Sequence, residues 1–178
     1  MKGVALIGLR RSGKSTIGRL LAARLHAPFV DTDLAIEERT GRTPRRWIEG
    51  TGLDAFRDLE AAEVARATAT PGRVVACGGG APLRADSARR LRAYGVVLYL
   101  RVDPWTLNDR ARTEAREVAA ERPALVDGPK SLEAFALFAE RDAVYAAVAD
   151  GIVDAASDPA SVVGRCVRRI RETEAVRP

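Results

Sequence analysis

Residues 8–15 read Gly8-Leu9-Arg10-Arg11-Ser12-Gly13-Lys14-Ser15, and they satisfy the pattern G-x-x-x-x-G-K-[ST]. An apolar run, Val4–Gly8, leads into this stretch, and apolar residues at helical spacing follow it. This strand–loop–helix context is typical of a phosphate-binding loop, or P-loop. Glycines let the backbone curl so that successive N–H groups point at phosphate oxygens, and the helix that follows adds the positive end of its dipole. The sequence therefore predicts a nucleoside triphosphate site.

Two side chains of the P-loop carry the chemistry that phosphoryl transfer needs. Lys14 supplies a positive charge to the β- and γ-phosphates, and the hydroxyl of Ser15 is placed to coordinate Mg²⁺. Lys14 is one of three lysines in an arginine-dominated chain, which fits a role for a compact ammonium group. We therefore expect ATP and Mg²⁺ as cofactors. The residues of the loop expected to bind the nucleotide are Arg11, Ser12, Gly13, Lys14, Ser15 and Thr16.

The composition is that of a globular protein with one domain. The chain has 178 residues, of which 47% are hydrophobic and 30% are charged, and this length is enough to bury a core. Its apolar runs are too short to cross a bilayer, and its first residues lack the cleavage site of a secretory signal. Two cysteines, Cys77 and Cys166, make neither a disulfide framework nor a zinc site. We expect a cytoplasmic monomer without membrane contact.

The formal net charge of +5 raises the question of a nucleic-acid partner. The arginines are scattered along the chain, and aromatic residues, which would stack on bases, make up only 5%. Arginines suit a small anionic ligand equally well, because the planar guanidinium group matches carboxylate and phosphate. We therefore expect a small-molecule partner and no nucleic acid.

Short apolar runs alternate with longer stretches of helical period. This alternation predicts a single α/β domain over residues 1–178, with a five-stranded parallel sheet flanked by helices. The first and fourth runs are almost wholly apolar, as strands buried on both faces should be. The predicted strands are Val4–Gly8, Pro28–Asp31, Arg73–Cys77, Val96–Arg101 and Gly151–Asp154.

Helix starts are marked by two Asp-Pro pairs, Asp103-Pro104 and Asp158-Pro159, because aspartate caps a helix and proline fits its first turn. Two segments do not fit the alternation. Residues 39–52 contain three glycines and a proline. Residues 113–130 are charged and contain two prolines, and we interpret them as a segment over the site, with a lid at about residues 112–125.

A pair of aspartates follows the second predicted strand, in the sequence Asp31-Thr32-Asp33. Ligands of open parallel sheets bind at the carboxyl ends of the strands. If the chain stays extended, both carboxylates lie on one side, where Asp31 can hold water on Mg²⁺ and Asp33 can accept a hydrogen bond from an acceptor hydroxyl. The alternative is a helix N-cap followed by an exposed acid. The chain lacks the Asn-Lys-x-Asp motif with which GTPases read their base, so a small-molecule kinase is favoured.

Further motifs accompany the P-loop and the aspartate pair. They are Phe56-Arg57-Asp58-Leu59-Glu60, Gly78-Gly79-Gly80, Arg122-Pro123-Ala124-Leu125 and Arg141-Asp142-Ala143-Val144-Tyr145. Many families share the P-loop, but this combination resembles the shikimate kinases, and the resemblance covers nearly the whole chain. It implies a three-layer P-loop fold like that of the nucleoside monophosphate kinases, with a substrate-binding segment at about residues 32–62 and a lid.

The resemblance implies a role for each residue that matches on the acceptor side. Asp33 would bind shikimate hydroxyls and guide the attacking one, while Asp31 would reach Mg²⁺ through water. Arg57 and Arg141 would hold the substrate carboxylate. The triple glycine Gly78-Gly79-Gly80 would contact the ring hydroxyls through its backbone.

On the donor side, the resemblance implies that Arg110 and Pro159 lie against the nucleotide. Arg122, in the lid, would approach the transferring phosphate, where a charge that arrives on closure is less screened by water. The expected catalytic residues are therefore Lys14, Asp33 and Arg122.

The reaction that the resemblance implies is transfer of the γ-phosphoryl group of MgATP to the 3-hydroxyl of shikimate, a step toward chorismate and the aromatic amino acids. The chain departs from the family at Leu53 and Ala55, where acids are usual, so another hydroxylated carboxylic acid such as gluconate stays open as the acceptor. The alternative from a different class is a regulatory or nucleic-acid-binding module that only senses ATP. Such a module would need neither a second aspartate facing an acceptor nor the arginine pair.

Overall fold

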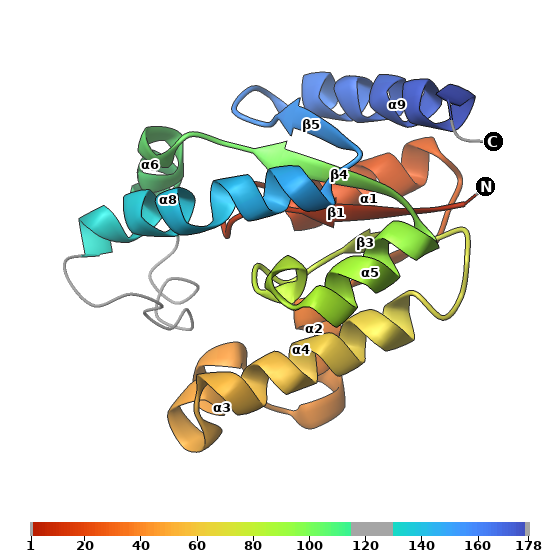
Figure 1. Ribbon diagram of the computed structural model, residues 1–178. Helices are drawn as coiled ribbons and strands as arrows, with labels where there is room; N and C mark the ends of the chain where they lie inside the picture. The colour runs from red at the N-terminus through yellow and green to blue at the C-terminus, as the bar shows by residue number, and fades with distance from the viewer. Residues whose placement is uncertain (1, 115–129, 177–178) are drawn as a thin grey trace.

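The computed structural model describes residues 2–114 and 130–176 (Figure 1). Their strands form one parallel sheet in the order β2-β3-β1-β4-β5. The register places Val4 beside Val74 on one side and beside Val96 on the other. The five strands predicted from the apolar runs are thereby confirmed. Their bounds are β1 Gly3–Ile7, β2 Phe29–Asp31, β3 Val74–Ala76, β4 Gly95–Arg101 and β5 Gly151–Asp154.

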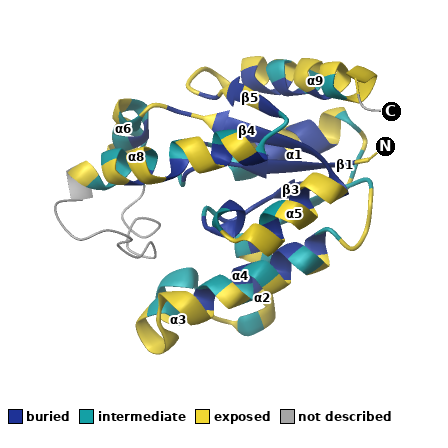
Figure 2. Cartoon of the chain, in the orientation of Figure 1, coloured by how far each residue is buried: buried dark blue, intermediate teal, exposed yellow. Residues whose placement is uncertain are grey.

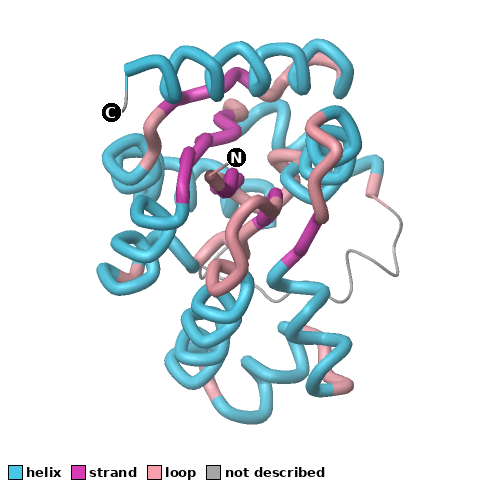
Figure 3. The backbone as a smooth tube through the Cα atoms, turned by 90° about the vertical axis from the view of Figure 1, so that its right-hand side faces the viewer, coloured by secondary structure: helices cyan, strands magenta, loops and turns pink. Residues whose placement is uncertain are grey.

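Helices cover both faces of the sheet, as Figure 3 shows for a view in which the strands lie between them. The first and last helices, α1 and α9, pack against each other on one face, while α5 and α8 pack on β4 from the other. The helix bounds are α1 Lys14–Arg24, α2 Thr32–Thr40, α3 Pro44–Thr51, α4 Leu53–Ala67, α5 Ala85–Tyr94, α6 Pro104–Thr113, α8 Lys130–Val148 and α9 Pro159–Val176, with a 3₁₀ turn, η1, at Ala81–Leu83. The predicted three-layer α/β arrangement is therefore confirmed.

The core lies along β1 and β4, at and beside the centre of the sheet (Figure 2). Every residue of β1 is buried, and so is every residue of β4 except Arg101. Strands with helices on both faces need apolar side chains in both directions, which is why these two segments show no polar alternation. The edge strand β5 alternates buried and exposed residues instead.

The predicted helix starts at the two Asp-Pro pairs are confirmed. The carboxylate of Asp103 accepts a hydrogen bond from the backbone N–H of Thr106 at 3.0 Å, and that of Asp158 accepts one from Ser161 at 2.9 Å. Each aspartate thus satisfies an N–H group that has no partner inside its helix.

Residues 39–52, which do not fit the alternation expected from the sequence, are mostly helical. Helix α2 runs to Thr40 and ends at Gly41, whose φ of 65° is left-handed, and helix α3 then occupies most of the segment. Thr43 caps α3 and Pro44 begins it, while Gly52, with φ of 88°, separates it from α4. Gly41, Pro44 and Gly52 therefore mark the ends of short helices, where their conformations are favoured, and they do not prevent helix formation.

Most of the predicted lid, about residues 112–125, lies outside the described residues. Helix α6 ends at Thr113, and the chain is described again from the start of α8 (Figure 1). Among the residues that the structure describes, no helix has the length and apolar character that a bilayer span requires.

Candidate active site

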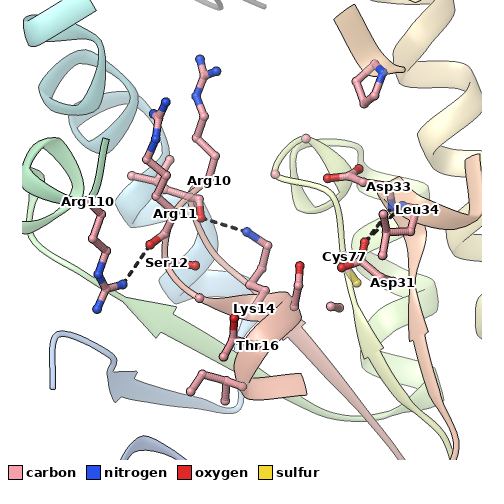
Figure 4. Close-up of a pocket in the computed structure, with 18 of the residues that line it drawn as sticks. Arg10, Arg11, Ser12, Lys14, Thr16, Asp31, Asp33, Leu34, Cys77 and Arg110 are labelled. Carbon is pink, nitrogen blue, oxygen red and sulfur yellow. Dashed lines mark hydrogen bonds between the residues drawn. The ribbon is translucent and has the colours of Figure 1, made fainter. Parts of the chain in front are cut away.

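A cleft of about 1210 Å³ lies at the carboxyl ends of the strands. Its lining comes from the P-loop, the start of α2, α3, α4, the triple glycine after β3, α6 and α8 (Figure 4). This edge of a parallel sheet is where side chains from separate loops converge, so segments far apart in the sequence meet there. The predicted site residues that line the cleft are Arg11, Ser12, Gly13, Lys14, Ser15, Thr16, Asp31, Asp33, Arg57, Gly79, Gly80, Arg110, Arg141 and Pro159.

The P-loop has the backbone conformation that its glycines allow. Gly8 has φ of 146°, and a Cβ atom there would lie 2.7 Å from the carbonyl oxygen of Leu100. Gly13 has φ of 93° and precedes α1 without any side-chain cap. Helix α1 therefore begins at the cleft, and a phosphate group there is a suitable acceptor for its first N–H groups.

Lys14 places its ammonium group at the mouth of the loop (Figure 4). The Nζ atom donates hydrogen bonds to the carbonyl oxygens of Gly8 at 2.9 Å and Leu9 at 2.8 Å. Arg11 also lies in this loop, in a left-handed conformation with φ of 66°, and its guanidinium group pairs with Glu114 at 3.1 Å. The loop thus presents positive charge to the cleft.

Arg110 connects the P-loop to the loop between β5 and α9. Its guanidinium group donates to the carbonyl oxygen of Arg11 at 2.9 Å and to that of Ala155 at 2.8 Å. Pro159, at the start of α9, lines the same end of the cleft. These contacts join α6, the P-loop and the loop after β5, which surround the part of the cleft predicted to bind the nucleotide, called the donor side below.

Asp31 caps helix α2, because its Oδ1 atom accepts hydrogen bonds from the N–H groups of Asp33 at 3.1 Å and Leu34 at 3.3 Å. The extended conformation that would place Asp31 and Asp33 on one side of a strand therefore ends at Asp31, and Asp33 lies in the first turn of α2. The premise of extended geometry was wrong, since the first aspartate begins a helix. Both carboxylates nevertheless line the cleft, across from Lys14 (Figure 4).

The part of the cleft predicted to bind the acceptor is called the acceptor end below. Arg57 and the triple glycine form one side of it. Arg57 pairs with Glu60, which is buried and accepts a hydrogen bond from the N–H of Gly80 at 3.3 Å. A Cβ atom at Gly80 would lie 1.7 Å from the Arg57 guanidinium group, and one at Gly78 would lie 2.5 Å from Asp33 Oδ1. The glycines therefore let charged side chains approach the backbone closely. Gly78 is buried and does not itself line the cleft.

Arg141 forms the other side of the acceptor end. It is only 5% exposed, and it belongs to the long helix α8. One turn later on the same helix, Tyr145 is fully buried, and its hydroxyl donates a hydrogen bond to the carbonyl oxygen of Gly79 at 2.6 Å. The triple glycine is thus held between α4 and α8.

Cys77 lies on the floor of the cleft, where the charges of both sides act on it. Burial raises the pKa of its thiol to about 12, the charge of Lys14 lowers it, and the carboxylates of Asp33, Asp31 and Glu60 raise it. A thiol with such a pKa stays protonated at neutral pH and is a poor nucleophile. The prediction that Cys77 is a small buried residue is confirmed.

Glu60 is a buried residue of the cleft to which no sequence motif gave a role. The side chain is 3% exposed and links Arg57 to the triple glycine. The available signal was its spacing, because Phe56, Glu60 and Val64 lie four residues apart on one helix face and all three are buried. A carboxylate on an apolar face needs a charged or hydrogen-bonding partner, which predicts a role in a site.

The residues present fit a Mg²⁺ ion shared with nucleotide phosphates. No group of three or more His, Cys, Asp and Glu side chains gathers into a metal site within residues 2–114 and 130–176. Magnesium in nucleotide sites usually takes one or two protein ligands and completes its shell with phosphates and water. Ser15 and Asp31 both line the cleft, and both capping bonds of Asp31 use its Oδ1 atom.

The predicted catalytic residue Arg122 lies outside the described residues.

Comparisons with known proteins agree with this geometry. The chain matches the shikimate kinase family over residues 10–171. It is 44% identical over 147 residues to the shikimate kinase of Symbiobacterium thermophilum, which covers 82% of both chains. Its structure matches a shikimate kinase from Acinetobacter baumannii in complex with shikimate, with a TM-score of 0.87, 27% identity and coverage of 99% of this chain and 96% of that one.

A gluconokinase from Sinorhizobium meliloti has the same fold, with a TM-score of 0.63, 21% identity and coverage of 98% of this chain and 94% of that one. At that identity the match concerns the fold alone, and the sequence matches do not favour the gluconate or the ATP-sensing alternative. The family resemblance noted from the motifs is confirmed, and with it an ATP-dependent kinase. The chain belongs to the shikimate kinase family.

Proposed function

We propose that this protein transfers the γ-phosphoryl group of ATP to the 3-hydroxyl of shikimate, giving shikimate 3-phosphate and ADP. The observation that carries the proposal is the composition of one cleft. The P-loop occupies its donor end, Arg57 and Arg141 occupy its acceptor end, and Asp33 lies at the acceptor end too. A hydroxylated carboxylic acid is the ligand class that two guanidinium groups and a carboxylate suit together.

On the donor side, the residues neutralise charge and hold the triphosphate. Phosphoryl transfer demands mainly positioning and electrostatic stabilisation, with little covalent work by the protein. The Lys14 ammonium group would leave its bonds to Gly8 and Leu9 for the phosphates, which are stronger acceptors. Arg110 and Pro159 would border the nucleoside, and Arg122 is proposed to act on the transferring phosphate.

On the acceptor side, the residues orient the nucleophile. The paired guanidinium groups would fix the carboxylate of shikimate, and the Asp33 carboxylate would accept a hydrogen bond from the attacking hydroxyl. Asp33 is held in the first turn of α2, and its Oδ1 faces Gly78, so it is presented at a fixed place beside the triple glycine. Fixing both ends of a rigid acceptor lowers the entropic part of the barrier.

Mg²⁺ is proposed to be held by the Ser15 hydroxyl and, through water, by Asp31. When bound, the ion would neutralise charge on the β- and γ-phosphates. The capping role of Asp31 and this role are compatible, because a carboxylate has two oxygen atoms and can accept several hydrogen bonds.

The division of the chain is proposed to follow the cleft. Residues 1–178 would form one kinase domain, in which about residues 32–62 bind the acceptor and about residues 112–125 form the lid. The protein is proposed to act as a monomer.

The experiment that tests the proposal measures ADP release from ATP and Mg²⁺ with shikimate, quinate, gluconate or no acceptor. We expect turnover with shikimate, at least about a hundredfold higher in kcat/KM than with the other acids, because both guanidinium groups and the triple glycine must be satisfied together. Lys14→Ala should abolish it. Turnover only with gluconate would reject the acceptor, and ADP release independent of any acceptor would favour an ATPase.

A further inference from the structure

The hydroxyl of Tyr145 lies in the interior beside the triple glycine, and the proposed reaction assigns it no role. Tyr145 has no exposed surface, and its hydroxyl donates to the carbonyl oxygen of Gly79 at 2.6 Å. Burial raises the pKa of Tyr145 to about 12, and the nearby guanidinium group of Arg141 lowers it. The phenol therefore stays protonated near neutral pH and remains a hydrogen-bond donor.

The peptide group that Tyr145 contacts is held from its other end as well. The carbonyl of Gly79 and the N–H of Gly80 belong to one planar peptide unit. The N–H of Gly80 donates to Oε1 of Glu60 at 3.3 Å, and Oε2 of Glu60 pairs with Arg57. Hydrogen bonds therefore run from Tyr145, through one rigid peptide plane and Glu60, to Arg57.

Tyr145 is also the neighbour of the second guanidinium group. Arg141 lies four residues earlier on α8, so the two side chains share one helix face. The positive charge of the Arg141 guanidinium group lowers the pKa of the Tyr145 phenol, in keeping with this shared face. The Gly79–Gly80 peptide is thus bonded on one side to Glu60, the partner of Arg57, and on the other side to Tyr145, the helix neighbour of Arg141.

We propose that Tyr145 is a positioning residue, whose hydroxyl fixes the Gly79–Gly80 peptide and thereby the spacing between the guanidinium groups of Arg57 and Arg141. The inference rests on the proposed function, because the spacing matters if both groups bind one carboxylate. Loss of the hydroxyl would leave the Gly79 carbonyl without this donor and let the peptide rotate. The acceptor would then bind less well, while the donor side would be unchanged.

The pair of aromatic rings next to the cleft offers a matched control. Tyr99 on β4 is 1% exposed, and its ring meets that of Tyr145 edge-on, with centroids 5.2 Å apart and an interplanar angle of 63°. The Tyr99 hydroxyl donates to Asp142 at 2.9 Å, and Asp142 also pairs with Arg101. Tyr99→Phe therefore removes a hydroxyl from the same buried ring pair, and this hydroxyl has no bond to the triple glycine.

The test compares Tyr145→Phe and Tyr99→Phe in steady-state kinetics with shikimate and ATP, together with the Tm of each. We expect Tyr145→Phe to raise the KM for shikimate about tenfold and to leave the KM for ATP unchanged. Tyr99→Phe should leave both KM values unchanged. Both variants should lower the Tm by about 2–4 °C, since each loses one buried hydrogen bond.

A double variant separates positioning from packing. If Tyr145 acts through the guanidinium spacing, Tyr145→Phe should raise the KM for shikimate by less in an Arg141→Lys background than in the wild type. Full additivity would overturn the inference, as would an unchanged KM for shikimate, equal effects on both KM values, or failure of Tyr145→Phe to fold. Wild-type protein without activity on shikimate would reject the proposed function and, with it, this inference.

Discussion

At the scale of single residues, the acceptor end of the cleft depends on charges that are buried and paired. Arg57 pairs with Glu60, and Arg141 is nine-tenths buried or more on α8. Buried guanidinium groups are desolvated in advance, so a carboxylate that reaches them is bound through short, charge-assisted contacts. Lysine at either position would supply the charge without the planar fork.

Arg57→Ala should raise the KM for shikimate by about a hundredfold, because a charge-assisted bidentate contact is lost. Arg84→Ala is the matched control, since Arg84 pairs with an exposed carboxylate, that of Asp58, and does not line the cleft. Initial-rate kinetics over a range of shikimate concentrations would measure both. Equal KM values for the two variants would remove Arg57 from the binding site.

The three glycines after β3 should differ in what they tolerate. A methyl group at Gly78 would meet the carboxylate oxygens of Asp33 and Glu60 at 2.5 Å, whereas one at Gly79 would meet its nearest neighbours at 3.8 Å. The clashing atoms are ends of side chains, so the protein can fold by moving them. We expect Gly78→Ala to lower kcat by about ten- to a hundredfold through displacement of Asp33.

Gly79→Ala should lower kcat less than Gly78→Ala does, and circular dichroism should show both variants folded. The reverse order of kcat values would mean that the position of Asp33 does not limit the reaction. The different neighbours of Gly78 and Gly79 could not be predicted from the sequence. Gly78-Gly79-Gly80 is a run of identical residues, and the side chains around it come from other elements.

At the scale of elements, the sequence predicted what depends on local pattern. Both faces of β1 and β4 are buried, so their residues are apolar, and the Asp-Pro pairs begin α6 and α9 because capping is a local interaction. Residues 39–52 do not show the alternation because Gly41 and Gly52 end short helices there, and the same residue types also occur in loops. Asp31 was open to two interpretations, and its capping contacts became known only from the structure.

Asp103→Ala should lower the free energy of unfolding by about 1 kcal/mol at pH 7, because the N-cap of α6 is lost. Hydrogen bonds from the hydroxyl and then the N–H of Thr106 hold the pKa of Asp103 below its usual range. Its ionised form is therefore favoured by folding. The stabilisation is complete above the unfolded-state pKa of about 3.9, and it is lost as the pH falls through the lower folded-state pKa.

Urea unfolding of wild type and Asp103→Ala at pH 7 and at acidic pH would measure this dependence. Asp103→Asn is the control, since asparagine caps a helix but does not titrate. A stability difference between wild type and Asp103→Ala that stayed constant down to pH 2 would contradict the ionic contribution of the cap.

At the scale of the whole molecule, the cleft joins segments that are far apart in the sequence. The P-loop could be predicted from residues 8–15 alone, because it is one contiguous motif in a strand–helix context. The acceptor end combines α2, α4, the loop after β3 and α8, and the family motifs named its residues without showing how they meet. Glu60 and Tyr145, which connect these segments, have roles that only the three-dimensional arrangement reveals.

The order of the strands explains why the two ends face each other. The P-loop follows the central strand β1, and the triple glycine follows its neighbour β3, so both loops leave the sheet at the same edge. Helices α2 to α4 follow β2, the edge strand next to β3. Helix α8 packs on β4, which neighbours β1 on the side away from β3. A ligand between these elements is therefore bordered by phosphate-binding groups on one side and by guanidinium groups on the other.

The central claim is that this cleft holds the negative charge of the acceptor opposite the triphosphate. The most direct measurement compares the kcat/KM of the wild-type protein for shikimate and for shikimate methyl ester, which keeps every hydroxyl and loses the charge. We expect the ester to be about a hundredfold poorer, with an unchanged KM for ATP. Equal kcat/KM values for the acid and the ester would contradict the account.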